Sequence, residues 1–201
     1  MTRGDDPQLD AFAVDVRELL ARNVANLYSH LITRPTGRAV RLAIEAQLAE
    51  LRGPALSVID FSSVAILDYS CADEVVAKLL LQGQWNRTQG RRVETFFVFR
   101  GIDERHQDPV LEVLARHGLA AVTGLGGTPA FELLGEASTE ERAAWRVVED
   151  AGRITEAALA AELPGWEAEP IVRRLAERGL VFLHPLRDEV HALSRLVRRV
   201  T

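Results

Sequence analysis

The 201-residue chain has one cysteine, one methionine, one lysine and no long apolar run. The single cysteine, Cys71, excludes an internal disulfide and a zinc site built mainly from cysteines. The apolar runs are too short for a membrane span, which needs about 20 predominantly apolar residues. The acidic stretch at residues 1–10 has no apolar core and predicts no signal peptide. With 47% hydrophobic and 26% charged residues, we expect a soluble cytoplasmic protein without a membrane partner.

The residue patterns of common enzyme and cofactor sites are also missing. The segment "TGLGGTP" at residues 123–129 lacks the Gly-Lys-Ser/Thr ending of a phosphate-binding loop, so we expect a turn there. No nucleophile stands in a pattern with an acid and a base. The histidines show no metal-ligand spacing: His30, His106, His117, His184 and His191. The sequence therefore predicts a protein that is not an enzyme and holds no metal or cofactor.

Negative charge predominates, with 29 acidic residues against 24 basic ones and a formal net charge of −5. This balance gives no global electrostatic reason to bind nucleic acid. All but one of the basic residues are arginine, the exception being Lys78. We interpret that imbalance as a GC-rich coding background rather than as selection for phosphate binding.

The first region, residues 9–134, alternates strand-like and helix-like patterns. Strands are expected at residues 11–16, 23–32, 55–61, 91–99 and 119–125. Helices are expected at about residues 33–51, capped by Thr33 or Thr36, at about 70–80, and from Pro109 to a stop at Gly118. The 91–99 strand is the most apolar and should lie centrally. This order predicts an α/β (α+β) fold with a mixed sheet covered by helices on one side.

The sequence changes character after residue 125, with Gly and Pro punctuation followed by small polar residues. We expect a short helix around Phe131–Leu134 and a linker at Gly135–Thr139. The second region, residues 139–201, is mainly helical.

Three short helices are expected in that second region. The first closes at Gly152, the second is capped by Thr155, and the third stops at Gly179. A hairpin then turns at residues 185–188. Three short helices followed by a hairpin are typical of a winged helix-turn-helix domain.

Four segments of the first region resemble the STAS domain, the fold of bacterial anti-sigma factor antagonists. They are the strand end at residues 60–64 ("DFSSV"), the junction at 68–70 ("DYS"), the apolar strand at 93–99, and the helix and strand at 108–122. The wording "YSCADEVV" is closest to an uncharacterised STAS-like branch whose junction has Ser-Phe-Ala-Asp-Glu, and "LITRPTGRAV" suits that branch. The resemblance covers about half of the chain.

In the STAS family a serine at this junction accepts a phosphoryl group from a partner kinase, and the matching position here is Ser70. The resemblance implies a GHKL-type serine kinase or an anti-sigma factor-like protein as partner. Its docking surface would comprise Asp68, Tyr69, Cys71, Asp73 and Glu74 around that serine. Tyr69 and Cys71 depart from the family's Asp-Ser-Ser-Gly pattern, as they replace its first serine and its glycine.

The same junction has a purely structural interpretation. Ser70 followed by Asp73 is a capping-box pattern, in which the serine hydroxyl accepts a bond from an early helical N–H. Asp73 and Glu74 in the first turn suit the helix dipole. A phosphate on Ser70 would also sit at a helix N-terminus, although Asp68, Asp73 and Glu74 would repel it. Capping alone and capping with phosphorylation both stay open, whereas the acidic surroundings of Cys71 favour an inert thiol.

The C-terminal region bears on whether the partner is DNA or protein. Residues 138–201 contain 10 arginines and 11 acidic residues, and the expected recognition helix begins with Glu167 and Glu169, where DNA contacts normally arise. Trp166, exposed at that helix start, would suit a protein partner. The candidate contacts with DNA or a partner are Trp166, Arg173, Arg174, Arg178 and Arg187. We predict protein contact or homodimerisation, with DNA binding as the less favoured alternative.

Together these patterns predict a non-enzymatic signalling or regulatory adaptor. Its STAS-like module would bind a protein partner, and its winged-helix domain would pass that state on through protein contact or dimerisation. The alternative is a DNA-binding transcriptional regulator with a STAS-like sensing domain.

Overall fold

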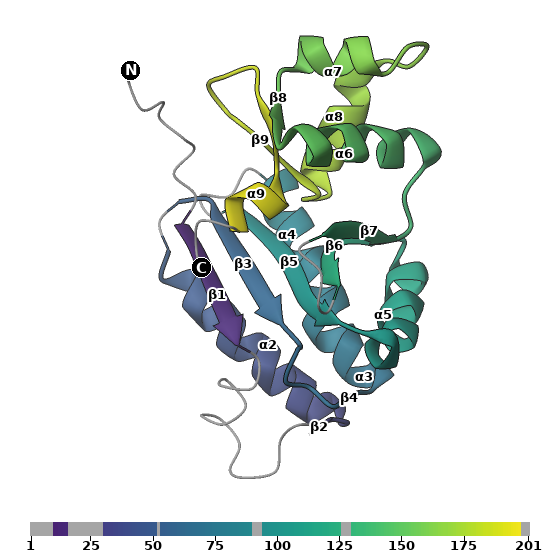
Figure 1. Ribbon diagram of the computed structural model, residues 1–201. Helices are drawn as coiled ribbons and strands as arrows, with labels where there is room; N and C mark the ends of the chain where they lie inside the picture. Colours follow the sequence, from purple (N-terminus) through teal and green to yellow (C-terminus); the bar gives the residue numbers. More distant parts are fainter. Residues whose placement is uncertain (1–9, 16–29, 52, 90–93, 126–129, 198–201) are drawn as a thin grey trace.

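A five-stranded mixed sheet forms the centre of the computed structural model, an α+β protein (Figure 1). The structure describes residues 10–15, 30–51, 53–89, 94–125 and 130–197. In sheet order the strands are β1 (Asp10–Asp15), β3 (Ala55–Asp60), β5 (Thr95–Ile102), β6 (Ala120–Leu125) and β7 (Phe131–Gly135). The first four run parallel, and β7 runs antiparallel to β6. The most apolar strand, β5, lies in the middle, as predicted.

Helices cover one face of this sheet, as the sequence predicts. They are α2 (Arg34–Ala49), a continuous helix formed by α3 (Tyr69–Ala72), η1 (Asp73–Ala77) and α4 (Lys78–Thr88), and α5 (Glu104–His117). Thr33 caps α2 by accepting a hydrogen bond from the N–H of Thr36. An apolar stripe of α2 is buried in the core beneath the helices, at Val40 and Ile44.

The C-terminal part of the chain covers the other face. It comprises α6 (Thr139–Ala151), β8 (Arg153–Ile154), α7 (Glu156–Glu162), α8 (Ala168–Glu177), β9 (Val181–Leu183), β10 (Val190–Ala192) and α9 (Leu193–Val197). Its strands form an antiparallel sheet in the order β8-β10-β9. Figure 1 shows α9 lying against the large sheet, with α7 and α8 beyond it.

Side chains alternate along the central strands between two hydrophobic cores. In β5, Phe97 and Phe99 enter the core beneath the helices, whereas Phe96 and Val98 enter a second core with residues of the C-terminal part. That second core includes Ile171 of α8. Because successive strand residues point to opposite faces, one apolar strand supplies both cores. The division into domains at residues 134 and 139 stays a prediction, and the two parts share this second core.

A second, very short parallel ladder lies at one end of the molecule. It pairs β2 (His30–Leu31) with β4 (Ile66–Leu67). Only the end of the strand predicted at residues 23–32 falls within the described residues. The ladder places the entry to α2 beside the junction at which α3 begins (Figure 1).

Two local predictions are wrong. Helix α5 begins at Glu104 rather than at Pro109, because Asp103 and His106 form a capping box that starts it one turn earlier. Pro109 lies inside the helix, where its ring removes one backbone donor. The segment at Phe131–Leu134 is strand β7 rather than a helix, because it pairs with β6.

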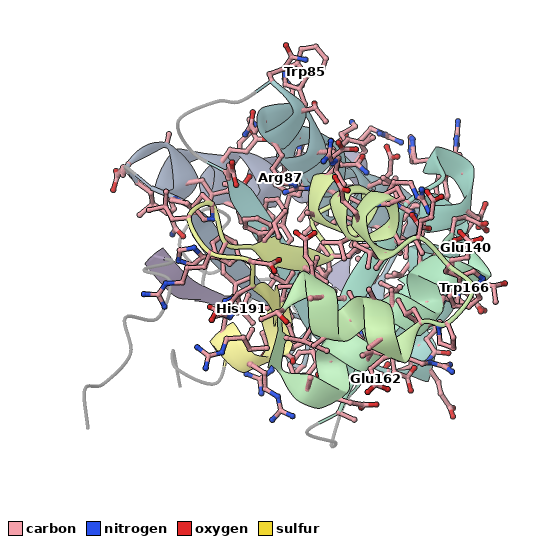
Figure 2. The ribbon with its side chains drawn as sticks, turned by 90° about the horizontal axis from the view of Figure 1, so that it is seen from above. Trp85, Arg87, Glu140, Glu162, Trp166 and His191 are labelled. Carbon is pink, nitrogen blue, oxygen red and sulfur yellow. The ribbon has the colours of Figure 1, made fainter. Side chains whose placement is uncertain are left out.

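Arg87, near the end of α4, joins the helical layer to the C-terminal part. Its Nε donates to the carbonyl oxygen of Glu177 in the last turn of α8 at 3.1 Å, and its Nη1 donates to that of Thr95. The guanidinium lies 5.1 Å from the ring centre of Phe96. A side chain at Gly179 would collide with it. Burial lowers the pKa of Arg87 to about 10, so the group stays charged at neutral pH. Figure 2 shows Arg87 turned inward and Trp85 turned outward.

We predict that Arg87→Ala lowers the free energy of unfolding by about 2–3 kcal/mol, because it removes the side-chain donor to the carbonyl oxygen of buried Thr95, the link to Glu177 and a cation–π contact. Urea denaturation followed by circular dichroism measures this loss. The matched control is Arg105→Ala, which removes an exposed guanidinium bonded to Asp103 and should change stability by less than about 0.5 kcal/mol. Equal losses in both variants would contradict a special role for Arg87.

Candidate functional site

The helix at the junction is capped by Asp68. Asp68 has an extended backbone with φ −83° and ψ 153°, and its Oδ1 accepts a hydrogen bond from the N–H of Ser70 at 2.7 Å. Tyr69 is the first helical residue and Ser70 the second. The prediction that Ser70 caps this helix is therefore wrong. Asp68 directly follows β4, where the backbone is still extended as an N-cap requires. Ser70 is thus not needed to start the helix.

The surface around Ser70 is partly apolar. Ile66 opens β4 and Ile32 directly follows β2, and these side chains are 47% and 51% exposed. In this parallel ladder His30 lies opposite Ile66 and Leu31 opposite Leu67, so Ile32, the next residue along the chain, lies at the end of the ladder that Ile66 opens. We call Ile32, Ile66, Tyr69 and Ser70 the junction face. Large exposed aliphatic side chains grouped together are typical of protein-contact surfaces.

Tyr69 is held in place on the junction face by α5. Its hydroxyl accepts a hydrogen bond from Nη1 of Arg116, whose guanidinium also lies 5.8 Å from the centre of the tyrosine ring. Tyr69 and Ser70 are both half-buried. The ring therefore has a defined position against which a partner could pack.

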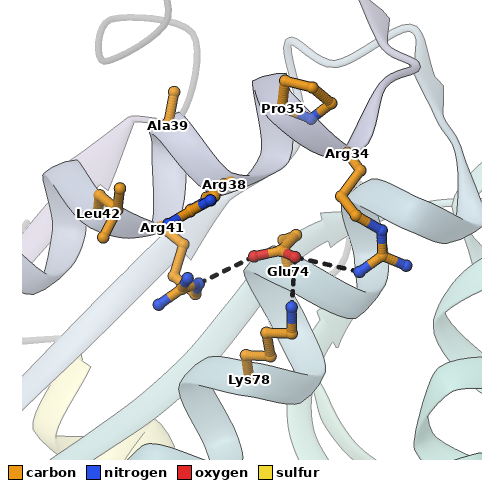
Figure 3. A pocket seen from close by; sticks show the side chains of 8 residues that line it. All are labelled: Arg34, Pro35, Arg38, Ala39, Arg41, Leu42, Glu74 and Lys78. Carbon is orange, nitrogen blue, oxygen red and sulfur yellow. Dashed lines mark hydrogen bonds and ion pairs between the residues drawn. The ribbon is translucent and has the colours of Figure 1, made fainter.

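Asp73 and Glu74 lie below this surface in an ion-pair network. Asp73 accepts from Nη1 of Arg34 at 2.8 Å and contacts Nε2 of His117 at 2.9 Å. Glu74, only 2% exposed, accepts from Arg34 at 3.1 Å, from Nε of Arg41 at 3.1 Å, and from Lys78 (Figure 3). Both carboxylates are thus engaged within the chain.

The wide turn η1 carries both acidic residues, which share Arg34 of α2 and each have a further partner. Asp73 turns toward His117 of α5, and Glu74 turns toward Arg41 of α2. Turns of this π type are rare and often occur at functional sites. The turn thereby links all three helices of the layer just beneath the junction face.

Both carboxylates stay ionised despite their burial. Loss of solvent raises the pKa of Asp73 and of Glu74, but hydrogen bonds outweigh this effect and hold both values below their usual range. The donors are Arg34 and His117 for Asp73, and Lys78 and Arg41 for Glu74. The repulsion that we expected between these carboxylates and a phosphate on Ser70 is therefore largely balanced by neighbouring cations.

Cys71 is fully buried where α2 and α3 touch. Its thiol donates to the carbonyl oxygen of Thr33 at 2.9 Å, and burial raises its pKa to about 11. A Cβ atom added to Gly37 would lie 2.9 Å from the Cα atom of Cys71. The thiol is therefore protonated at neutral pH. The close approach of Gly37 also requires a small side chain at position 71.

The arginines proposed as C-terminal contacts lie in different environments. Arg178 faces inward, where it pairs with Glu141 at 2.8 Å and donates to the carbonyl oxygen of Gly118. Arg173 is exposed on α8 but pairs with Glu169, and Arg174 lies near Glu140. Arg187 is exposed in the turn between β9 and β10. The structure therefore does not bring the four arginines into one exposed patch.

Negative charge gathers instead at the start of α8. Partial burial raises the pKa of Glu156, and the nearby carboxylates of Asp188 and Glu169 raise it further, against an opposing effect of Arg173. Trp166, two residues before α8, is 38% exposed, and Figure 2 shows it near Glu140. The set Glu162, Trp166, Glu167 and Glu169, all exposed, is called the acidic turn below. Such a surface repels DNA phosphates.

Sequence reasoning missed the cations of the network. Arg34 and Arg41 lie two helical turns apart on α2, a spacing that does place them on one face, but their partners are about 40 residues away. His117, which the sequence showed only to lack metal-ligand spacing, contacts Asp73 through Nε2. Helix packing brings these residues together.

Within the described ranges, no group of three or more His, Cys, Asp or Glu residues is placed to hold a metal ion. No helix in that same part of the chain is long and apolar enough to cross a membrane. A scan against protein-family models and searches of curated proteins and of solved structures find no match to this chain. The fold and this site define an α+β protein with a partly apolar face over a buried ion-pair network.

We predict that Asp68→Ala lowers the free energy of unfolding by about 1 kcal/mol, because the N–H of Ser70 loses its acceptor. Ser70→Ala should change it by less than about 0.5 kcal/mol, because the serine does not cap the helix. Urea denaturation of both variants beside the wild type measures the difference. A larger loss in Ser70→Ala than in Asp68→Ala would reinstate Ser70 as the cap.

We also predict that Glu74→Gln weakens the pH dependence of stability. Because the folded pKa of Glu74 lies below its unfolded value of about 4.3, its contribution is present above that value and is lost as pH falls toward the folded pKa. The variant should be less stable by about 3 kcal/mol at neutral pH and should lose less stability on acidification. Urea denaturation from pH 7 down to pH 3, with exposed Glu112→Gln as control, tests this. Parallel wild-type and variant curves would contradict it.

Proposed function

We propose that this protein is a non-enzymatic regulatory adaptor that docks a partner protein on the junction face. The observation that carries the proposal is the exposure of Ile32 and Ile66 beside Ser70, a serine that the helix does not need as a cap. Beneath the junction face, the carboxylates of Asp73 and Glu74 are bonded to neighbouring arginines. This arrangement suits a rigid support rather than a reaction centre.

The proposed architecture is a STAS-like module, residues 9–134, followed by a winged-helix module, residues 139–201. Parallel strands alternating with helices on one face agree with the first. The order α6, β8, α7, α8, β9, β10, with β8 paired to the hairpin strand β10, agrees with the second. The winged-helix module would pass on the docked state through protein contacts or dimerisation.

Ser70 is the proposed phosphorylation site of this adaptor. It lies in the first turn of a helix that continues to Thr88, where the helix dipole favours an anion. The next turn of this helix carries Asp73 and Glu74, and both carboxylates accept from Nη1 of Arg34. The Arg34 side chain is 50% exposed. Among the described residues its Nη2 has no partner, and we propose this group as a donor to the phosphate. A GHKL-type serine kinase or an anti-sigma factor-like protein would be the partner.

The alternative, a DNA-binding regulator, has less support. Arg178 is committed to Glu141, and the acidic turn lies where a recognition helix would meet phosphates. Arg173, Arg174 and Arg187 are the candidate DNA contacts that remain exposed.

We predict that a photo-crosslinking residue at position 66 captures one main partner protein in cells that express this chain. The same residue at the exposed position Leu186, on the hairpin turn, is the control and should not capture it. With the purified partner, Ile66→Arg should weaken binding about 30-fold, as expected for loss of one interface anchor. Leu111→Arg, an exposed site on α5, should leave binding unchanged. The same adducts at both positions, or none at position 66, would refute the docking role.

Two further measurements on the same protein separate the alternatives. Intact mass after co-expression with a GHKL-type kinase should show one phosphate that Ser70→Ala removes, and a phosphate that persists in this variant would exclude Ser70. Duplex DNA binding should be weak and insensitive to Arg173→Ala combined with Arg174→Ala. Salt-steep DNA binding that this double variant abolishes would favour the transcriptional regulator instead.

A further inference from the structure

A basic cleft lies on the outer side of the helical layer, away from the sheet. Helix α2 and the η1–α4 helix border an open cleft of about 620 Å³ there, and Arg34, Arg38, Arg41 and Lys78 line it around the carboxylate of Glu74 (Figure 3). We call this set, with Leu42 on its wall, the basic cleft. A cavity of this volume is large enough to receive side chains from another molecule.

The basic cleft carries more positive than negative charge. Arg34, Arg41 and Lys78 share Glu74, and Arg41 also pairs with Glu45. Arg38 is exposed and has no ion pair within the described part of the chain. Four cations thus meet Glu74, Glu45 and the adjoining Asp73, which leaves an excess of one positive charge. On a protein with a net charge of −5, this is a place where an acidic group would bind rather than be repelled.

Exposed apolar side chains continue the cleft along its two helices. Leu42 of α2 lines the cleft and is exposed. On α4, Leu81 and Trp85 follow Lys78 by three and seven residues, which places them on the same side of the helix, and Trp85 is 57% exposed. An occupant that matches this surface combines carboxylates with a large apolar side chain.

The acidic turn of the C-terminal part has that chemistry. It carries exposed Glu162 and Glu167 close in sequence to exposed Trp166, together with Glu169, which pairs with Arg173 at 2.7 Å, and the sequence contains no lysine or arginine between Arg153 and Arg173. Burial is the main cause that raises the pKa of the nearby Glu156, and repulsion from the carboxylates of Asp188 and Glu169 raises it further. Placing a cation from another molecule against this turn would relieve that repulsion.

We propose that the basic cleft of one copy of this protein binds the acidic turn of a second copy. Figure 1 places α2 and α3 at one end of the molecule and α7 at the other, so a chain cannot fill its own cleft. The contact joins two different surfaces and is therefore head-to-tail, which produces rings or open chains of copies rather than a closed symmetric pair. The proposal does not depend on a partner at the junction face or on phosphorylation of Ser70.

The contact has a recognisable physical signature. Charge pairs at an exposed cleft are screened by salt, whereas the buried indole of Trp166 would act as the central anchor. Assembly should therefore increase with protein concentration, weaken as salt is added and extend beyond a dimer. Sedimentation velocity and light scattering of the full-length protein measure these properties.

Two pairs of substitutions disable the two halves of the contact without touching the buried network. Arg38→Glu with Leu42→Glu alters the cleft, and Glu162→Lys with Glu167→Lys alters the turn; all four side chains are exposed. Each double variant should be monomeric at concentrations at which the wild type assembles. Mixed in equal amounts, they should associate again, because the intact cleft of one variant meets the intact turn of the other and the two altered surfaces are also opposite in charge.

Matched variants carry the same chemical changes at other exposed positions. Arg146→Glu with Leu111→Glu matches the cleft variant, and Glu104→Lys with Glu112→Lys matches the turn variant. Both should assemble as the wild type does. Circular dichroism melting verifies that every variant is folded before its mass is measured.

A wild type that remains monomeric at low salt and high concentration would overturn the proposal, and so would a variant mixture that forms no dimer. Assembly lost equally in the matched variants would also overturn it. A synthetic peptide of residues 156–169, followed by its tryptophan fluorescence, is a separate probe of the cleft. If it binds wild type but not Arg38→Glu while the full-length chain stays monomeric, the cleft takes an acidic segment of another protein and the second-copy assignment fails.

Discussion

A parallel sheet is stable in water only when both of its faces are covered, and this constraint governs the molecule. The helices α2, α4 and α5 cover one face, and the C-terminal helices and hairpin cover the other. The two parts of the chain therefore form opposite walls around a single sheet. Each wall has an outer surface: the basic cleft on the helical side and the acidic turn on the C-terminal side.

The helix from Tyr69 to Thr88 connects the surfaces that this arrangement creates. Its first turn carries Ser70 on the junction face, its wide turn η1 holds the ion-pair network, and its last turn carries Arg87. Arg87 binds the final turn of α8. A partner docked on the junction face would thus press on an element that reaches the C-terminal part directly. This physical continuity would suit the proposed adaptor, in which binding at one surface must change the structure or contacts of another.

Local patterns sufficed where a residue's neighbours in sequence are also its neighbours in space. The stripe of Val40 and Ile44, the cap at Thr33 and the stop at Gly118 are such cases. Capping at the junction was ambiguous because Asp68 and Ser70 are both good capping residues two positions apart, and the extended backbone after β4 selected Asp68. The strand β7 was mistaken for a helix because its form depends on a partner, β6, rather than on its own residues.

The sequence by itself determined the α+β class, most of the elements and the position of Ser70 at a helix start, because these follow from periodicity and capping. Tertiary structure decided what surrounds that serine. Asp73 and Glu74 look like exposed first-turn acids in the sequence, but the packing of α2 and α5 buries them against Arg34, Arg41 and His117. It also turned Arg178 inward. Such contacts join residues about 40 positions apart, and no local sequence pattern specifies which distant charged residue will lie beside a given side chain.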